Sequence, residues 1–316
     1  MGACSMRSTL RIFNIILLLV LSVATHNCIG TDYREEKDRN ISGVESVHVG
    51  DINISYKILG QGDPIVLIMG YGSTMDTWDP VFLDNLSSKY KVIIFDNRGM
   101  GSTTAPSGNF SISQFANDTA GLMTALGIEK AHILGWSMGS FVAQELAIRY
   151  PEKVDKLILY AGDCGGKEAV MPSPQVLKDL TNTSGSPEER GMRLFNLLFP
   201  DEWLSRQPAF YKWFPLPKET SLPENIQRQA QACATWPGSS DRLGSIKSPA
   251  LVVTGTQDVI APPENAFILA QRINASWLVQ FEGAGHGLMY QYPNRLAKIV
   301  TDFIELSDME SEGKGT

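Results

Sequence analysis

The chain has 316 residues, of which 43% are hydrophobic, and its 27 Lys and Arg against 34 Asp and Glu give a formal net charge of −7. This length and composition are typical of a soluble globular protein with a full hydrophobic core. The acidic balance argues against nucleic acid as a partner, because phosphate binding depends on clustered Lys and Arg. The four histidines are scattered without zinc-ligand spacing, so we expect no metal and no other cofactor.

The first thirty residues carry the pattern of an export signal. Arg7 and Arg11 precede an apolar run over residues 12–24, which ends in a small-x-small cleavage pattern. This run is shorter than the ~20 residues that span a bilayer, so residues 1–30 are predicted to be a signal peptide, with an uncleaved membrane anchor as the alternative. Residues 31–43 are predicted to be a flexible linker. We therefore expect an exported protein, either secreted or anchored at the outer face of the membrane.

Glycosylation sequons and cysteines fit the same interpretation. Chance alone would give roughly two Asn-x-Ser/Thr triplets at this composition, although a high content of Ser and Thr is the alternative explanation for a larger number. The sequons begin at Asn40, Asn53, Asn85, Asn109, Asn117, Asn182 and Asn274. In an oxidising compartment Cys164 and Cys233 are a candidate disulfide pair, and their pairing stays open at this point. We expect a glycoprotein.

Beyond the linker, hydrophobic patterning predicts alternating strands and helices. Residues 44–59 alternate as two half-exposed strands divided by a turn at Gly50-Asp51. Further strands are predicted at residues 65–69, 92–95, 131–134, 157–160, 251–253 and 277–281. Candidate helices cover residues 78–90, 111–126, 138–150, 263–273 and 293–306. Apolar strands joined by helical crossovers predict a mostly parallel sheet with helices on both faces.

The alternation stops over residues 164–245, which are predicted to form an inserted helical cap. About 80 residues without strand-like runs are too many for one loop in a compact domain, so we expect several short helices. Examples are residues 174–180, 187–198 and 223–235. The core domain would then comprise residues 44–163 and 246–307, followed by a charged tail at 308–316.

Aromatic side chains are frequent in this predicted cap. They are Trp203, Phe210, Tyr211, Trp213, Phe214 and Trp236. Most are expected to pack the cap onto the sheet, and the remainder would line a pocket for an apolar acyl or alcohol group. A small apolar molecule is therefore the expected ligand of this pocket.

The strongest chemical motif follows the strand at residues 131–134. That strand runs into Gly135-Trp136-Ser137-Met138-Gly139, and a helix-forming segment comes directly afterwards. The two glycines permit a strand-to-helix turn tight enough to raise the serine hydroxyl above the sheet, where the helix N-terminus favours negative charge. The pattern predicts a nucleophile elbow with Ser137 as the nucleophile.

The partners of such a serine follow it in the order acid, then histidine. His286 is the only histidine downstream of Ser137 and is therefore the predicted general base. Asp258 ends the strand immediately before the one that leads to His286, so it is the favoured acid. Asp163, which follows the strand at residues 157–160, is the alternative acid. The acid would hold the histidine tautomer and stabilise the imidazolium.

An oxyanion hole needs two backbone N–H groups, one of them from the residue after the nucleophile. Met138 is predicted to supply the first. The loop Gly70-Tyr71-Gly72-Ser73 follows the strand at residues 65–69, and the N–H of Tyr71 is the preferred second donor. Gly72 and Ser73 are the alternatives for that second donor.

Together these motifs resemble the α/β-hydrolase superfamily, in its branch of esterases, lactonases and cofactor-free perhydrolases. The segments that carry the resemblance are Ile68-Met69-Gly70-Tyr71-Gly72, Phe95-Asp96-Asn97-Arg98-Gly99-Met100-Gly101-Ser102, Gly135-Trp136-Ser137-Met138-Gly139, Gly255-Thr256-Gln257-Asp258 and Gly285-His286-Gly287. The resemblance implies the α/β-hydrolase fold, a mostly parallel eight-stranded sheet with an inserted helical cap, and is greatest to methyl esterases of polyketide-type substrates. It also implies that Asp96 and Arg98 brace the loop beneath the site. One departure is Met69, which stands where the family usually has His.

The sequence thus predicts a serine hydrolase, a carboxylesterase-like enzyme that cleaves a carboxylic ester or lactone through an acyl-enzyme. The same three side chains would also serve a perhydrolase, a thioesterase or an aminopeptidase. A ligand-binding protein that retains the triad is a third hypothesis. The proline-specific aminopeptidase branch is disfavoured, because its Gly-Gly-Pro loop has no counterpart at Gly70-Tyr71-Gly72.

Overall fold

The structure is a computed structural model that describes residues 43–182, 184–207, 209–212, 214–215 and 217–312. The described residues belong to one compact unit. The predicted signal peptide or anchor and nearly all of the predicted linker lie outside the described residues. Within the described part of the chain, no helix combines the length and the apolar character needed to cross a membrane.

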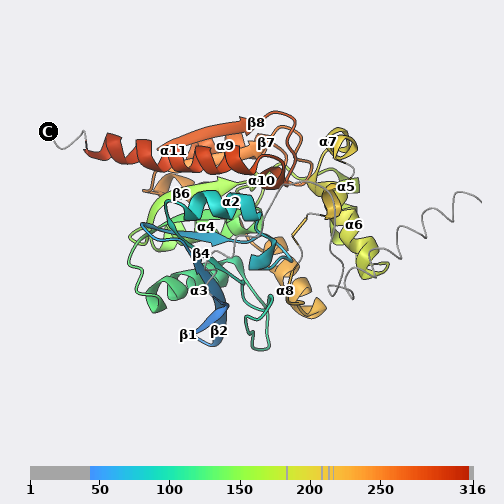
Figure 1. Ribbon diagram of the computed structural model, residues 1–316, viewed down its shortest axis with the longest axis horizontal. Coiled ribbons are helices and arrows are strands. Elements are labelled where there is room, and N and C mark those ends of the chain that lie inside the picture. Colours follow the sequence, from blue (N-terminus) through green and yellow to red (C-terminus); the bar gives the residue numbers. More distant parts are fainter. Residues whose placement is uncertain (1–42, 183, 208, 213, 216, 313–316) are drawn as a thin grey trace, which may run out of the picture. The chain divides into compact units, whose positions relative to one another are not determined.

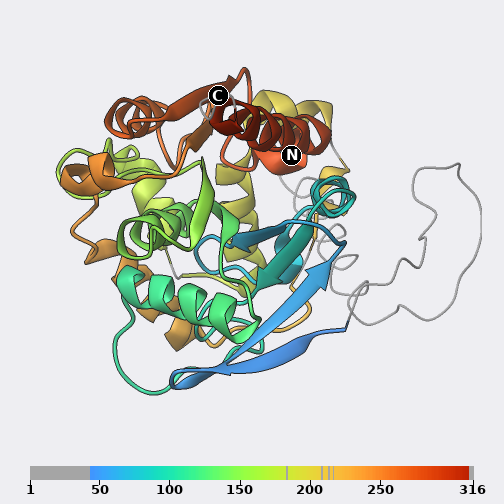
Figure 2. The same cartoon turned by 90° about the vertical axis from the view of Figure 1, so that its left-hand side faces the viewer.

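Eight strands form one sheet in the order β1-β2-β4-β3-β5-β6-β7-β8 (Figure 1). Their bounds are β1 Glu45–Val49, β2 Ile52–Leu59, β3 Pro64–Ile68, β4 Lys91–Phe95, β5 Ala131–Trp136, β6 Val154–Tyr160, β7 Ala250–Gly255 and β8 Ser276–Phe281. Strands β1 and β2 pair antiparallel, as do β2 and β4, and the other neighbours are parallel. Figure 2 shows the β1–β2 hairpin in blue at one edge of the sheet. The predicted fold class is confirmed.

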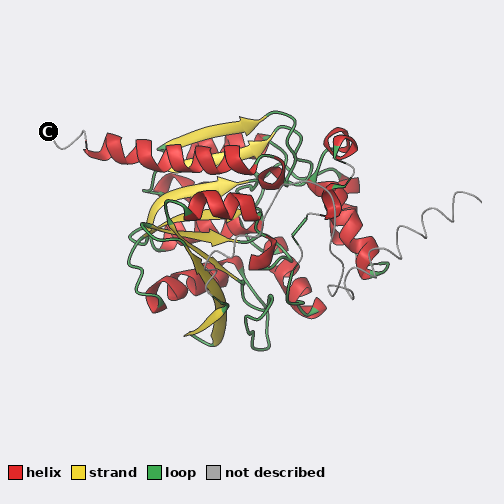
Figure 3. Ribbon diagram, viewed as in Figure 1, coloured by secondary structure: helices red, strands yellow, loops and turns green. Residues whose placement is uncertain are grey.

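Helices cover both faces of the sheet (Figure 3). Successive side chains of a strand point to opposite faces, so a strand that is apolar throughout is buried only when both faces are covered. The helices that pack on the sheet are α2 Pro80–Ser87, α3 Ile112–Ala125, α4 Met138–Arg149, α9 Glu264–Arg272, α10 Leu288–Gln291 and α11 Pro293–Glu312. In β3, Val66 belongs to the core beneath α3, α4 and α9, and Leu67 belongs to the core beneath α2 and α11. The strand is therefore buried on both sides, as its continuous apolar run predicts.

Between β6 and β7 the chain forms further helices, which include every one predicted there. They are α5 Pro174–Thr181, α6 Pro187–Leu198, α7 Asp201–Arg206 and α8 Pro223–Ala234, with short 3₁₀ turns η2 Phe210–Lys212 and η3 Ser240–Ser245. Helix α6 begins with a full capping box, in which Ser186 and Glu189 exchange side-chain-to-backbone hydrogen bonds. Helix α7 is not predicted, because six residues are too few to show a helical period. The division of the chain into core and cap stays a prediction.

Two helices have ends that differ by more than one residue from those predicted. Helix α2 spans Pro80–Ser87 and not residues 78–90, and it begins at Pro80 because the side chain of Asp79 caps it by accepting a hydrogen bond from the N–H of Phe82. Helix α11 continues to Glu312 and so extends into the predicted charged tail. No glycine or proline interrupts the sequence between Pro293 and Gly313, so polar composition alone does not end this helix.

Candidate active site

Ser137 lies at the sharp turn between β5 and α4. Its backbone has φ 56° and ψ −122°, a left-handed conformation that is rare for a residue with a side chain. Its N–H donates a 2.9 Å hydrogen bond to the carbonyl of Tyr160 on the neighbouring strand β6. A Cβ on Gly135 would collide with the backbone of Gly139, and one on Gly139 would collide with the carbonyl of Ile68. Both glycines of the motif are therefore required by close backbone contact.

His286 and Asp258 form a buried pair. Nδ1 of His286 lies 2.8 Å from Oδ2 of Asp258, and the two residues follow β8 and β7 respectively. The other carboxylate oxygen of Asp258 accepts 2.9 Å hydrogen bonds from the N–H groups of Ile260 and Ala261. A carboxylate beside Nδ1 selects the tautomer that carries its proton there, which leaves Nε2 free to accept one.

The backbone of His286 is held beside the elbow. Its carbonyl accepts hydrogen bonds from the indole of Trp136 at 3.2 Å and from the hydroxyl of Tyr160 at 2.7 Å. The rings of Trp136 and His286 lie 5.7 Å apart. The structure thus brings the imidazole to the residue that precedes Ser137. The Ser137 hydroxyl makes no hydrogen bond within the described residues, and such bonds in free hydrolases often form only when substrate binds.

Asp163 is not bonded to His286. Its Oδ1 accepts a 2.7 Å hydrogen bond from the N–H of Gly165, and its carbonyl accepts one from Gln144. Burial raises the pKa of Asp163 to about 6, against the hydrogen bond from Gly165 and the nearby charge of His286, which lower it. Of the two predicted acids, Asp258 is the one that contacts the imidazole.

The predicted oxyanion loop lies against the serine. A Cβ on Gly70 would be 3.2 Å from the Cβ of Ser137. The N–H of Gly72 donates a 2.7 Å hydrogen bond to Oε1 of Gln229 and is therefore occupied. Neither Tyr71 nor Met138 has its backbone N–H in a hydrogen bond to any described residue, so both predicted donors are available.

Residues beneath the loop brace it. The side-chain amide of Asn97 donates a 3.0 Å hydrogen bond to the carbonyl of Met69, the residue that stands where the resemblance leads one to expect His. Asp96 accepts a 2.7 Å hydrogen bond from the N–H of Met75, and burial raises its pKa to about 6. Arg98 makes two hydrogen bonds to Asp118, of 2.7 and 2.8 Å. These contacts agree with a structural role for Asp96 and Arg98.

The end of α6 contacts the histidine loop. The carbonyl of Leu198 accepts a 2.8 Å hydrogen bond from the N–H of Gly287, and a Cβ on Gly287 would come within 2.5 Å of the ring of Phe199. Phe199 joins an aromatic cluster whose members are Phe195, Phe199, Trp203, Phe210, Phe214 and Tyr290. Trp213 lies outside the described residues. Trp203, Phe210 and Phe214 therefore pack in one cluster, which Tyr290 connects to α10.

Two further aromatics of the predicted cap lie elsewhere. Trp236 stacks on Phe141 at 4.7 Å, and its indole N–H donates a 2.9 Å hydrogen bond to Glu145 on α4. Tyr211 is 39% exposed. Cys164 and Cys233, the candidate disulfide pair, are both free thiols in the structure.

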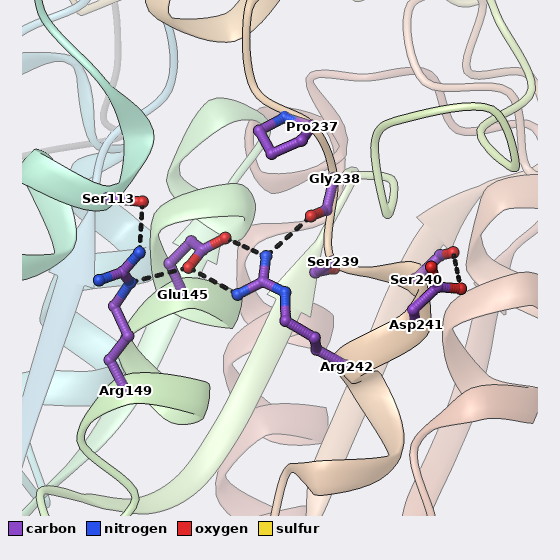
Figure 4. A pocket seen from close by; sticks show the side chains of 9 residues that line it. All are labelled: Ser113, Glu145, Arg149, Pro237, Gly238, Ser239, Ser240, Asp241 and Arg242. Carbon is purple, nitrogen blue, oxygen red and sulfur yellow. Dashed lines mark hydrogen bonds and ion pairs between the residues drawn. The ribbon is translucent and has the colours of Figure 1, made fainter.

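A surface pocket of about 380 Å³ lies apart from these residues (Figure 4). Its lining includes Arg149 and Arg242, and none of Ser137, Asp258 and His286. Both arginines bond to the carboxylate of Glu145, so their charges are already paired. The pocket is a polar junction between α4 and η3.

Sequence reasoning missed three residues of this region. Asn97 lies within a quoted motif and Tyr160 within an apolar strand, and neither pattern indicates a role at the site. Gln229 has no motif around it, because its contact with Gly72 joins positions 157 residues apart. Only the tertiary structure brings such residues to the site.

Comparisons with known proteins agree with the fold. A family model described as alpha/beta hydrolase fold matches residues 63–202, and one described as TAP-like protein matches residues 222–315. The chain is similar to "Putative carbamate hydrolase RutD" from Azorhizobium caulinodans, with 26% identity over 273 aligned residues, and the match covers 81% of this chain and 96% of that protein. It is also similar to "Putative non-heme chloroperoxidase" from Synechocystis sp., with 29% identity over 278 aligned residues, and this match covers 80% of this chain and 95% of that protein. The crystal structure of the enol-lactonase from Burkholderia xenovorans LB400 superimposes with a TM-score of 0.72 and 25% identity, covering 83% of this chain and all of that one.

Proposed function

Because the chain belongs to the α/β-hydrolase superfamily, we propose that it is a serine hydrolase that cleaves carboxylic esters or lactones through an acyl-enzyme. The observation that carries the proposal is the 2.8 Å contact between His286 and Asp258 next to the strained turn at Ser137. The names of the similar proteins, an enol-lactonase and a carbamate hydrolase among them, support cleavage of an acyl bond.

The reaction would proceed in two acyl transfers. His286 takes the proton of the Ser137 hydroxyl on Nε2 while the serine oxygen attacks the carbonyl carbon of the ester. The N–H groups of Tyr71 and Met138 stabilise the oxyanion, and Asp258 stabilises the imidazolium. Collapse of this intermediate breaks the bond to the alcohol, which leaves with the proton from His286. Water then repeats the sequence on the acyl-enzyme and releases the acid.

Turnover of p-nitrophenyl esters by the full chain and by its Ser137→Ala variant tests the proposal. Loss of a triad nucleophile lowers kcat by ~10⁴ to 10⁶-fold. Equal release of p-nitrophenol by the two proteins would contradict it. A parallel substitution, Ser140→Ala, is not a suitable control because Ser140 is fully buried under the elbow. Ser113→Ala, on the surface of α3, is the matched control and should retain full activity.

A perhydrolase is the second candidate, and the similarity to a protein named as a non-heme chloroperoxidase favours it. In that reaction hydrogen peroxide, in place of water, would attack the acyl-enzyme, and the products would be a peracid and free Ser137. Oxidation of bromide in the presence of acetate and peroxide measures the peracid. Ester hydrolysis with no peracid formed would exclude this second candidate.

Export stays a proposal, and the positions of the sequons support it. Among the sequon asparagines that the structure describes, those that are exposed are Asn53, Asn85, Asn109, Asn117 and Asn274. Glycosylation presupposes exposed side chains in an exported protein. Treatment of the native protein with a peptide glycosidase should lower its mass, and mass spectrometry of the native N-terminus should show whether residues 1–30 have been removed.

A further inference from the structure

The end of α6, residues 198–200, lies on the loop that carries His286. The carbonyl of Leu198 accepts a 2.8 Å hydrogen bond from the N–H of Gly287. A Cβ on Gly285 would come within 2.6 Å of the same carbonyl oxygen. The end of α6 therefore contacts the loop immediately before and immediately after His286.

Close contact with α6 explains both glycines of Gly285-His286-Gly287. Neither glycine has a positive φ, and Gly287 has φ −86°, so a left-handed backbone is not the reason for glycine at these positions. A Cβ on Gly287 would instead lie 2.5 Å from the ring of Phe199, far inside the ~3.5–4.0 Å at which carbon atoms pack. The lack of a side chain on either side of His286 lets the ring and the helix end reach the loop.

Phe199 is itself held by neighbouring rings. It is 3% exposed, and its ring stacks on Trp203 with the centroids 5.2 Å apart. The rings of Phe195 and Phe210 lie 5.0 and 5.2 Å away, and that of Tyr290, on α10, lies 6.0 Å away. Because buried side chains are closely packed, the ring of Phe199 does not swing away from the histidine loop without disturbing its neighbours.

The imidazole depends on the loop because few of its own atoms are held. Among the described residues, the His286 ring makes one hydrogen bond, between Nδ1 and Asp258. Trp136 and Tyr160 hold the backbone carbonyl of His286. A small rotation of the loop can leave these contacts in place and still turn Nε2 away from Ser137. A displacement of about 1 Å at a reacting group can cost about 100-fold in rate.

We propose that Phe199 is a positioning residue for His286. Its ring and the carbonyl of Leu198 hold the loop in the orientation that directs Nε2 toward Ser137. The inference rests on the ester hydrolysis proposed above, and it makes the end of α6 part of the geometry of the reaction. Substrate need not touch Phe199 for this role, so the effect of its removal falls on kcat and not on KM.

A double-mutant cycle between Phe199 and Gly287 tests the proposal. Gly287→Ala places a methyl group against the ring and should lower kcat on p-nitrophenyl valerate about 100-fold. Phe199→Ala releases the loop and should lower kcat about tenfold, with KM changed less than about twofold. The double variant has room for the methyl group, so its kcat should equal that of Phe199→Ala. Independent effects would multiply to a loss of about 1,000-fold and would overturn the proposal.

Phe195→Ala is the matched control. Phe195 belongs to the same aromatic cluster and is half-buried, but within the described residues no ring contact or hydrogen bond joins it to the loop at residues 283–287. The control should change kcat by less than about threefold. A loss equal to that of Phe199→Ala would show that any damage to the cluster lowers activity. A raised KM at unchanged kcat in Phe199→Ala would show that the ring binds substrate. Either result overturns the proposal.

Labelling of Ser137 by a fluorophosphonate gives the same readout without an ester. The serine oxygen displaces fluoride from phosphorus while His286 takes the serine proton on Nε2, so the labelling rate also depends on the position of the imidazole. The variants should show the same order of rates as in turnover, and independent effects in this cycle would again overturn the proposal. If Phe199→Ala does not fold, Phe199→Leu, which also lacks the ring, takes its place in both cycles. Failure of the proposed ester hydrolysis would instead show as equal turnover by the full chain and Ser137→Ala.

Discussion

The hydroxyl of Tyr160 donates a 2.7 Å hydrogen bond to the carbonyl of His286 and accepts one of 3.0 Å from the N–H of Met289. The ring is fully buried and stacks on Trp136. The Tyr160 hydroxyl thus links β6, the strand next to the elbow, to the loop that carries His286.

Tyr160→Phe should therefore lower kcat without changing the substrate contacts. Trp136 still donates to the His286 carbonyl, so we expect a loss of about threefold to tenfold in kcat, an unchanged KM and about 1 kcal/mol less stability. Steady-state kinetics and denaturant unfolding measure these quantities. A higher KM at the wild-type kcat would show that Tyr160 does not act through His286.

Asp258→Asn should nearly abolish activity. Asparagine keeps the shape of the side chain but cannot stabilise the imidazolium or hold the proton on Nδ1 of His286, and in a serine protease the equivalent change costs ~10⁴ in kcat. Asp163→Asn, the same substitution at the alternative acid, should cost less than about tenfold because Asp163 makes no hydrogen bond to His286. The reverse order of the two effects, measured on one p-nitrophenyl ester, would assign the acid to Asp163.

Glu145 should stabilise the protein in a manner that depends on pH. Burial alone would raise its pKa, but hydrogen bonds from Arg242, Trp236 and Arg149 outweigh burial and lower the pKa from 4.5 to about 2. The stabilisation is therefore complete above about pH 4.5 and is lost as the pH falls from 4.5 toward 2. Glu145→Gln should cost about 1–3 kcal/mol at pH 7 and flatten the acid limb of the stability curve.

Urea unfolding at a series of pH values measures this prediction. The matched control is Glu202→Gln, where an exposed carboxylate pairs with Arg206 on the surface of α7. It should change the free energy of unfolding by no more than about 0.5 kcal/mol. Equal effects of the two substitutions at pH 7 would contradict the role assigned to Glu145.

Gly139→Ala should destabilise the elbow strongly. The new methyl group would collide with the carbonyl of Ile68 on the next strand, so we expect a loss of about 3 kcal/mol or a protein that fails to fold. Gly191→Ala places the same methyl group in open space within α6 and should stabilise the protein by about 0.5–1 kcal/mol. Thermal unfolding of both variants checks the pair, and a stable Gly139→Ala protein would refute the close-packing argument.

Most of the sheet could be predicted from the sequence, because strands buried on both faces are continuous apolar runs. The elbow at Ser137 and the paired positions of Asp258 and His286 follow from local motifs and from the rule that parallel strands end at one edge. Helix ends are predicted less accurately. The start of α2 depends on a side-chain hydrogen bond of Asp79, and the polar composition after residue 306 conceals the continuation of α11.

Contacts between distant segments could not be predicted. The choice between Asp163 and Asp258 needed the geometry of the imidazole, and the occupied N–H of Gly72 needed the position of Gln229. Helices α5 to α8 carry no motif that indicates which of their side chains face the sheet. The contact between Gln229 and Gly72 depends on how α8 packs, which is a tertiary property.

The location of the acyl group is the most direct test of the proposed mechanism. The full chain is mixed with excess p-nitrophenyl ester, quenched in acid during turnover and digested, and the peptides are analysed by mass spectrometry. We predict one added acyl group on the peptide that contains Ser137, and none on the same peptide of the Ser137→Ala protein. An acyl group on any other residue, or turnover with no acylated peptide, would contradict the assignment of Ser137 as the nucleophile.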